Sequence, residues 1–262
     1  MKTDYGRMFR QVAAISYMTF QELLREKILW SSFVFGLLCV GLAYAASQLS
    51  YTDNARIALD FGLTSVSLVG GLISIIMGSV LIAKEVQNRT LYLILTKSVW
   101  RSQFVVGRLI GLLGILSLNT LIMVGISVVV FLFTGGDLGS LLVKSLFLQV
   151  TEFGVLAAIA CIFSVFSTAT LAAIFSSGVW VIGHAMTDLK ALSSRIEPEF
   201  MRPVLGLITN LLPDLTRFDI KAHVAHDLPV TWTYIAVTMG YGFVYIVFAL
   251  AAACLIFRKR DL

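Results

Sequence analysis

Charged residues are scarce in this sequence, and their scarcity decides its class. Only 13% of the 262 residues are Asp, Glu, Lys or Arg, whereas 58% are hydrophobic and the mean hydropathy is +0.90. A soluble domain of this length could not bury so much apolar surface. The composition therefore predicts an all-α protein that resides in a membrane, where apolar side chains face lipid.

Cysteine and proline are also rare. Cys39, Cys161 and Cys254 each lie inside an apolar run, and no two have the spacing of metal ligands, so we expect buried hydrophobic side chains and no metal site. The four prolines all fall between residues 198 and 229. A secondary transporter usually has interrupted helices at matching positions of two halves, and no such repeat is visible here.

Motifs of catalysis are absent as well. The sequence contains no HExxH, no GxSxG and no Asp cluster that could hold metal-bound phosphates. It has no Gly-Lys pair and therefore no P-loop. We expect no catalytic residue, no cofactor and no ATP hydrolysis by this chain itself. Glu152 and His184 are the main ionisable residues within the apolar runs.

Intervals without charge predict six transmembrane helices in a single transmembrane domain of residues 1–262. The interval between Glu152 and Asp188 is too long for one helix at about 20 residues per crossing, so it is divided at the polar turn of residues 164–170. The predicted spans are 28–47, 61–83, 108–133, 142–165, 169–187 and 231–257.

The distribution of basic residues predicts the orientation of these spans. Thirteen of the twenty Lys and Arg residues lie before the first span, between spans two and three, or after the last span. Basic residues collect on the cytoplasmic side of membrane proteins. We therefore expect a multi-pass protein of the cell inner membrane with both termini in the cytoplasm.

Three segments are neither spans nor simple loops. Residues 5–27 place apolar side chains at near-helical spacing among charges, which predicts an interfacial helix along the inner surface. Residues 188–230 form the large outer segment, and its apolar stretch FMRPVLGLITNLLP, residues 200–213, is too short to cross, so it is expected to be re-entrant or interfacial. The third is the cytoplasmic stretch of residues 84–103.

The stretch 84–103 mixes charge with an apolar helical face, which a short connecting turn would not need. Its apolar members could anchor a helix to the bundle: Leu91, Leu93, Ile94 and Leu95. Its charged members could face a partner: Glu85, Arg89, Lys97 and Arg101. This pattern favours a membrane subunit that is driven by another protein.

The sequence resembles a known family, the permeases of ABC-2 type transporters. The segment AKEVQNRTLYLILTKSVWRSQFVVGRLIG is similar to the exit of the second span in that family, and its matching positions are Glu85, Arg89, Thr90, Arg101, Gly107 and Arg108. The family often has proline at the position of Ser98 and lysine at that of Arg108. LLPDLTRFDIK, residues 211–221, resembles the outer motif before the last span, and FRKRDL, residues 257–262, resembles the usual ending.

The resemblance implies a permease that works as a dimer, either of this chain or with a similar one, together with two separate ATP-binding subunits. It places a coupling helix in residues 84–103, with Glu85, Arg89, Thr90 and Arg101 facing the ATPase, and it implies export. Nucleic acid is not an expected partner. Two alternatives stay open: a membrane-anchored scaffold or signalling protein without transport, and a secondary transporter.

Two features inside the spans need an explanation. Glu152 is costly in a membrane and must meet a partner or water, so it either contacts the transported substrate or hydrogen-bonds to a neighbouring span. His184 is its nearest ionisable candidate, although the predicted boundaries place it about 10 Å shallower at 1.5 Å per residue. Gly107, Gly111 and Gly114 of the third span are predicted to permit close helix packing.

Overall fold

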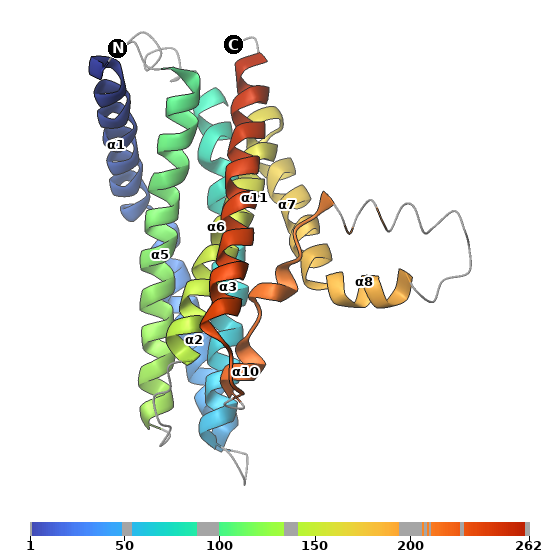
Figure 1. The fold of residues 1–262 in the computed structure, drawn as a ribbon. Coiled ribbons are helices and arrows are strands. Elements are labelled where there is room, and N and C mark those ends of the chain that lie inside the picture. Colours follow the sequence, from blue (N-terminus) through green and yellow to red (C-terminus); the bar gives the residue numbers. More distant parts are fainter. Residues whose placement is uncertain are drawn as a thin grey trace.

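The computed structural model describes residues 2–48, 54–87, 100–133, 141–193, 206, 209, 211–225 and 228–259. Over these residues all regular structure is helical, which confirms the all-α prediction (Figure 1). The long helices are α1 (Lys2–Leu24), α2 (Lys27–Gln48), α3 (Asn54–Gln87), α5 (Arg101–Phe133), α6 (Leu141–Phe166), α7 (Ala169–His184) and α11 (Trp232–Lys259). Shorter ones are α8 (Met186–Ser193), η1 (Leu215–Phe218) and α10 (Lys221–Ala225).

Helix α3 forms the centre of the bundle, where it packs against α2, α5, α6 and α7. Small residues on α3 let its neighbours approach closely. A Cβ atom on Gly78 would lie 2.7 Å from the carbonyl oxygen of Ala157 on α6, and the ring of Phe153 lies against Gly70. In membrane bundles, where lipid is as apolar as a side chain, such close packing is the main attraction between helices.

Among the described residues, four helices are long and apolar enough to cross a membrane: α3, α5, α6 and α11. In the most apolar part of α3, 78% is buried, whereas in that of α11 only 22% is buried. Helix α11 therefore lies at the edge of the bundle and turns an apolar face away from it. Two shorter apolar helices, Trp30–Ala46 within α2 and Ala169–His184, account for the other predicted spans. That these two helices also cross the membrane, which would give six spans, stays a prediction.

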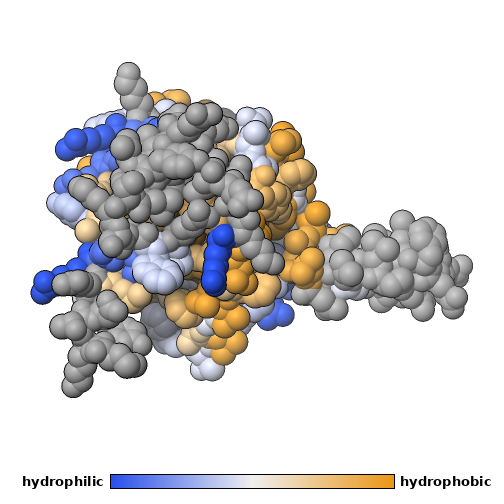
Figure 2. All heavy atoms as spheres, turned by 90° about the horizontal axis from the view of Figure 1, so that it is seen from above, coloured by the Kyte–Doolittle hydropathy of each residue, from blue (hydrophilic) through white to orange (hydrophobic). Residues whose placement is uncertain are grey.

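Both termini lie at one end of the bundle (Figure 1). Figure 2 looks onto that end and shows hydrophilic residues gathered on the side of α1, whereas hydrophobic residues cover the opposite side. The predicted topology makes this the cytoplasmic end, and we refer to it below as the inner end.

Helix α1 lies alongside the first half of α5 and runs in the same direction (Figure 1). Cβ atoms on Gly107, Gly111 and Gly114 would meet Ile15, the Ser16 carbonyl oxygen and Phe20 at 2.8, 2.6 and 3.2 Å. The close packing predicted at these glycines is thus confirmed, and the partner is α1.

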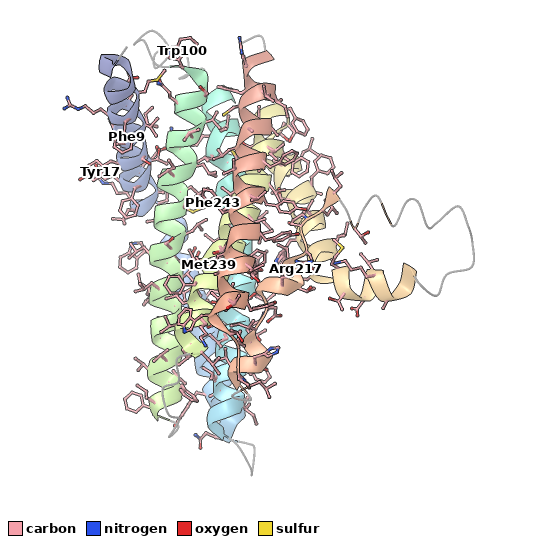
Figure 3. All side chains as sticks on the ribbon, viewed as in Figure 1. Phe9, Tyr17, Trp100, Arg217, Met239 and Phe243 are labelled. Carbon is pink, nitrogen blue, oxygen red and sulfur yellow. The ribbon has the colours of Figure 1, made fainter. Side chains whose placement is uncertain are left out.

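The outward face of α1 is different in kind. Phe9 and Tyr17 point away from the bundle (Figure 3) and are largely exposed. Tyr17 joins an aromatic ring to a polar hydroxyl, and such side chains favour the lipid–water boundary. The interfacial position of this helix stays a prediction, but its long contact with α5 is a feature that the sequence pattern did not indicate.

Helix α7 ends three residues before the predicted end of the fifth span at residue 187. Helix α7 begins after Thr168, whose hydroxyl accepts from the Leu171 N–H, and it ends at His184. Ala185 caps it, and α8 then leaves in another direction (Figure 1). Two other predicted features fall largely outside the described residues: most of the coupling stretch, residues 88–99, and most of the apolar stretch 200–213.

Candidate functional site: a buried acid–histidine pair and the segment that covers it

Glu152 of α6 and His184 of α7 lie together inside the bundle. The Nε2 atom of His184 is 3.3 Å from the Oε1 atom of Glu152, and the Glu152 side chain is only 2% exposed. The depth difference of about 10 Å expected from the sequence is therefore wrong.

The reason is the geometry of an antiparallel helix pair. Glu152 precedes the end of α6, at Phe166, by 14 residues, and His184 follows the start of α7, at Ala169, by 15 residues. At 1.5 Å per residue both residues lie roughly 21–23 Å from the turn that joins the helices. Two residues equally far from a tight turn come to the same level.

The hydrogen bonds of His184 fix one proton in this pair. Its Nδ1 atom lies 3.1 Å from the carbonyl oxygen of Trp180, which can only accept, so Nδ1 carries a hydrogen. Nε2 and Oε1 would repel each other if both presented lone pairs at 3.3 Å. The contact is therefore attractive when one of these two atoms carries a hydrogen, and it is an ion pair when His184 is protonated.

Other polar atoms surround the pair. Gln149, one turn before Glu152, donates through Nε2 to the Leu63 carbonyl oxygen of α3 at 3.4 Å. Trp180, one turn before His184, stacks edge-on against the histidine ring and lies over Gly71 of α3. Within the described part of the chain, Gln149 Oε1 and Trp180 Nε1 are buried without a hydrogen-bond partner, and the buried Glu152 Oε1 has the His184 ring nitrogen as its contact. A site of this kind can bind water or a polar group.

The outer segment returns along the bundle beside the pair and is anchored by Asp214. Its carboxylate accepts from Lys190 Nζ at 2.5 Å, Thr216 Oγ1 at 2.5 Å and Arg217 Nε at 3.4 Å. Burial alone would raise the pKa of the Asp214 carboxyl, but these three donors outweigh it and hold the pKa below its ordinary value. The carboxylate thus ties α8 to η1.

Aromatic residues of α11 complete this anchor. The backbone N–H of Asp214 donates to the Tyr241 hydroxyl at 2.9 Å, and the Arg217 guanidinium lies 5.0 Å from the centre of the same ring. We call the set Lys190, Asp214, Thr216, Arg217 and Tyr241 the outer anchor.

Between these polar contacts the motif PDLTRF inserts its apolar residues into the core. Leu215 and Phe218 are fully buried. Leu215 lies against Gly183 of α7, and Phe218 lies against Gly242 of α11. The motif that suggested a family resemblance is therefore the part of the outer segment that docks on α7 and α11. Nothing in its sequence alone indicates these two partners.

The predicted coupling residues are only partly described. Glu85 lies in the last turn of α3 and Arg101 is the first residue of α5, while Arg89 and Thr90 lie outside the described residues. Arg108, which matches the same motif, points to α1 and donates to Glu22 Oε2 at 2.6 Å. Glu22 is a partner that the sequence pattern did not single out.

The family described as ABC-2 family transporter protein matches residues 13–262 of the chain. No curated protein matches the sequence. The matched range includes the paired residues, the outer anchor and the helices on both sides of the stretch 88–99. The chain therefore belongs to the ABC-2 transporter family, as a multi-pass membrane protein and the membrane component of an ABC transporter rather than an enzyme.

Proposed function

We propose that this chain is the permease subunit of an ATP-driven exporter, that two permease chains form the translocation path, and that two separate ABC-type ATPase subunits drive it. The observation that carries the proposal is the family match over residues 13–262 in a chain that has no P-loop of its own. A transporter that cannot bind ATP by that route needs a partner that does.

The two helices that flank residues 88–99 are suited to carry motion from such a partner. Helix α3 has 34 residues and α5 has 33, so each is about 50 Å long at 1.5 Å per residue. A bilayer core is about 30 Å thick, so both helices extend beyond it. A partner that binds between their inner ends acts on two stiff elements, and its differential affinity for two arrangements would shift the population between them.

The coupling role of residues 84–103 can be tested by reversing charge. Glu85→Lys and Arg89→Glu should lower the ATPase activity that depends on the permease, without lowering the amount of folded permease. Truncating one side of a buried charged contact costs about 2–5 kcal/mol, enough to abolish most of the complex. Asp188→Lys on α8 is a matched control, because it reverses an exposed acid far from that stretch. Normal copurification and normal ATPase activity in both variants would remove these residues from the interface.

The class of function is tested by what drives transport. Vesicles that contain the permease and its ATPase should move substrate only with ATP. Transport driven by an ion gradient alone would establish a secondary transporter instead. A complex that never moves any substrate, although it copurifies and signals, would establish the scaffold.

The membrane topology that underlies this proposal has its own test. The three native cysteines are first replaced, and Ala191→Cys or His223→Cys is then introduced singly. Both positions are exposed, so each new thiol should react with an impermeant reagent on intact spheroplasts. If labelling requires an opened membrane, the predicted orientation of the chain is wrong and must be reversed.

The buried pair fits a structural role more closely than a path role. Glu152 is enclosed within one chain by α6 and α7 and is 2% exposed. A residue that contacts substrate needs access to the path in at least one state. We propose that the Glu152–His184 pair holds α6 and α7 together, and that a path role would require these helices to separate.

A further inference from the structure

A pocket of about 160 Å³ lies at the inner end between α1, α3 and α5. Its polar wall consists of Glu22 of α1, Glu26 between α1 and α2, Lys84 of α3 and Arg108 of α5. The rest of its lining is apolar and includes Ile76 and Val80 of α3. The pocket thus has charged groups on one side and hydrocarbon on the other.

The four charges form two ion pairs of unequal strength. Arg108 donates to Glu22 at 2.6 Å and is nearly buried, whereas the Lys84–Glu26 contact is 3.3 Å long. The Lys84 side chain is 52% exposed and that of Glu22 is 44% exposed. An ammonium has three N–H donors and Glu26 accepts one of them, and a carboxylate has more acceptor sites than one arginine N–H uses. Both signs of charge are therefore accessible in one pocket, and their sum is zero.

The apolar side of the pocket continues as a strip along α3. Leu72 and Ile76 are exposed, Val80 is half-buried, and the next residue at the same spacing is Lys84. Residues four apart lie on one face of a helix, so these side chains form a row of about 18 Å at 1.5 Å per residue. The row is apolar throughout until it reaches the ammonium group.

We propose that this pocket binds a phospholipid of the inner leaflet whose headgroup carries both a phosphate and a protonated amine. Lys84 donates to the phosphate, Glu22 accepts from the amine, and an acyl chain lies along Val80, Ile76 and Leu72. A headgroup with only a negative charge would face two carboxylates, and one with only a positive charge would face Lys84 and Arg108. A zwitterion meets an opposite charge at each end.

The proposal needs neither ATP nor the partner subunit, so it can fail without any failure of the proposed transport function. The full-length chain is purified in a delipidating detergent, and phosphatidylethanolamine, phosphatidylcholine or phosphatidylglycerol is added at equal concentration. Retained lipid is counted by native mass spectrometry. We expect phosphatidylethanolamine to be retained best, because phosphatidylcholine has no N–H to donate and phosphatidylglycerol has no cation.

Two variants locate the binding site. Lys84→Met keeps the apolar stem and removes the ammonium, and it should weaken retention of phosphatidylethanolamine about tenfold, the effect of losing one hydrogen bond to a charged group. Val80→Trp fills the pocket without touching its charges and should weaken retention at least as much. Lys221→Met is the matched control, because Lys221 also forms a 3.3 Å ion pair, with Asp219, but in the outer segment.

Three outcomes would overturn the proposal. Equal retention of all three lipids would show that the charges do not select the headgroup. Unchanged retention in a folded Lys84→Met or Val80→Trp variant would place the lipid elsewhere. A change of oligomeric state in Val80→Trp with no effect on lipid would assign the strip on α3 to a second copy of the chain.

Discussion

The inner and outer halves of this bundle are held together in different ways. In the outer half, Asp214 is 11% exposed and accepts from three side chains, while Tyr241 binds its backbone. In the inner half, α1 is held to α5 by close packing and the Arg108–Glu22 pair, whereas the described ion pair that reaches α3 from the turn after α1, Lys84–Glu26, is long and largely exposed. Exposed pairs contribute little to stability, whereas buried carboxylates with several donors contribute more.

This difference fits the proposed function, in which an ATPase subunit acts on the inner end of the bundle. The outer anchor fixes α8, η1 and α11 to one another, so motion there requires several contacts to break together. The Lys84–Glu26 link between the turn after α1 and α3 can change with little cost in free energy. Regions that move are drawn from the less stable parts of a structure.

Removing the carboxylate of the outer anchor should have the largest effect. Asp214→Ala leaves Lys190, Thr216 and Arg217 without their acceptor. Because both cations are about half exposed and can regain water, we expect a loss of about 2–3 kcal/mol, the range for hydrogen bonds to charged groups. Thermal unfolding of the purified chain measures it. Asp219→Ala, which removes a more exposed acid paired with Lys221, should cost clearly less, and equal losses would refute the special role of Asp214.

The same contact predicts a dependence on acid. The pKa of Asp214 in the folded chain lies below its ordinary value of 3.8, so the folded state favours the carboxylate. That contribution is fully present above pH 3.8 and is lost as the pH falls through the lower folded pKa. The stability difference between the native chain and Asp214→Asn should therefore shrink in this acidic range. A difference that stays constant there would mean that the charge of Asp214 does not matter.

The buried pair lies deeper in the outer half and should contribute next. Glu152→Ala leaves His184 without its partner and should destabilise by about 1–3 kcal/mol, whereas Glu152→Gln keeps shape and hydrogen-bonding capacity and should fold nearly normally. Ser176→Ala on α7 is a control, because that buried hydroxyl bonds only to its own helix at Ala172. If Gln folds normally but changes the transport rate or the preferred substrate, the pair belongs to the path. Unchanged stability and transport in both Glu152→Ala and Glu152→Gln would rule out the structural role and the path role.

Crowding the contact between α1 and α5 tests the inner half. Gly111→Val would place a side chain 2.6 Å from the Ser16 carbonyl oxygen, and overpacking of this kind costs about 1–3 kcal/mol. Gly125→Val on the same helix is the control, because nothing lies within 4 Å of a Cβ there. A cysteine at buried Thr19 should react with a thiol reagent only when α1 lifts from α5. A protected Thr19→Cys in the presence of Gly111→Val would show that α1 is held by other contacts.

Much of the fold could be predicted from the sequence because long apolar runs can hardly be anything but buried or lipid-facing helices. Five of the seven long helices begin and end close to the predicted limits. Helices α3 and α5 each begin seven residues before the predicted start, in stretches that contain charged residues. Charge marks where a chain leaves the hydrocarbon and not where its helix stops. Intervals between charged residues therefore underestimate helices that continue into water.

The candidate site was less predictable, for two different reasons. The meeting of Glu152 and His184 could have been found by counting outward from the turn at residues 167–168, since an antiparallel pair places equal distances at equal depth. The role of Asp214 could be predicted only in part, because Thr216 and Arg217 lie two and three residues after it, whereas Lys190 approaches from α8 and depends on how α8 leaves α7. Tertiary contacts of this kind carry no local sequence pattern.

The smallest effect is expected at the Lys84–Glu26 link between the turn after α1 and α3. Glu26→Gln and Lys84→Met should each change stability by less than about 1 kcal/mol, because the pair is exposed and its attraction is screened by salt. A double-mutant cycle separates the pair from its surroundings, and the coupling should fall further when the salt concentration is raised. If the cycle instead gives a coupling as large as the loss in Asp214→Ala, the inner half is held as firmly as the outer one, and motion driven from the inner end would have to begin elsewhere. A small coupling together with reduced ATPase stimulation in the same variants would show that this weak link is needed for transmission and not for folding.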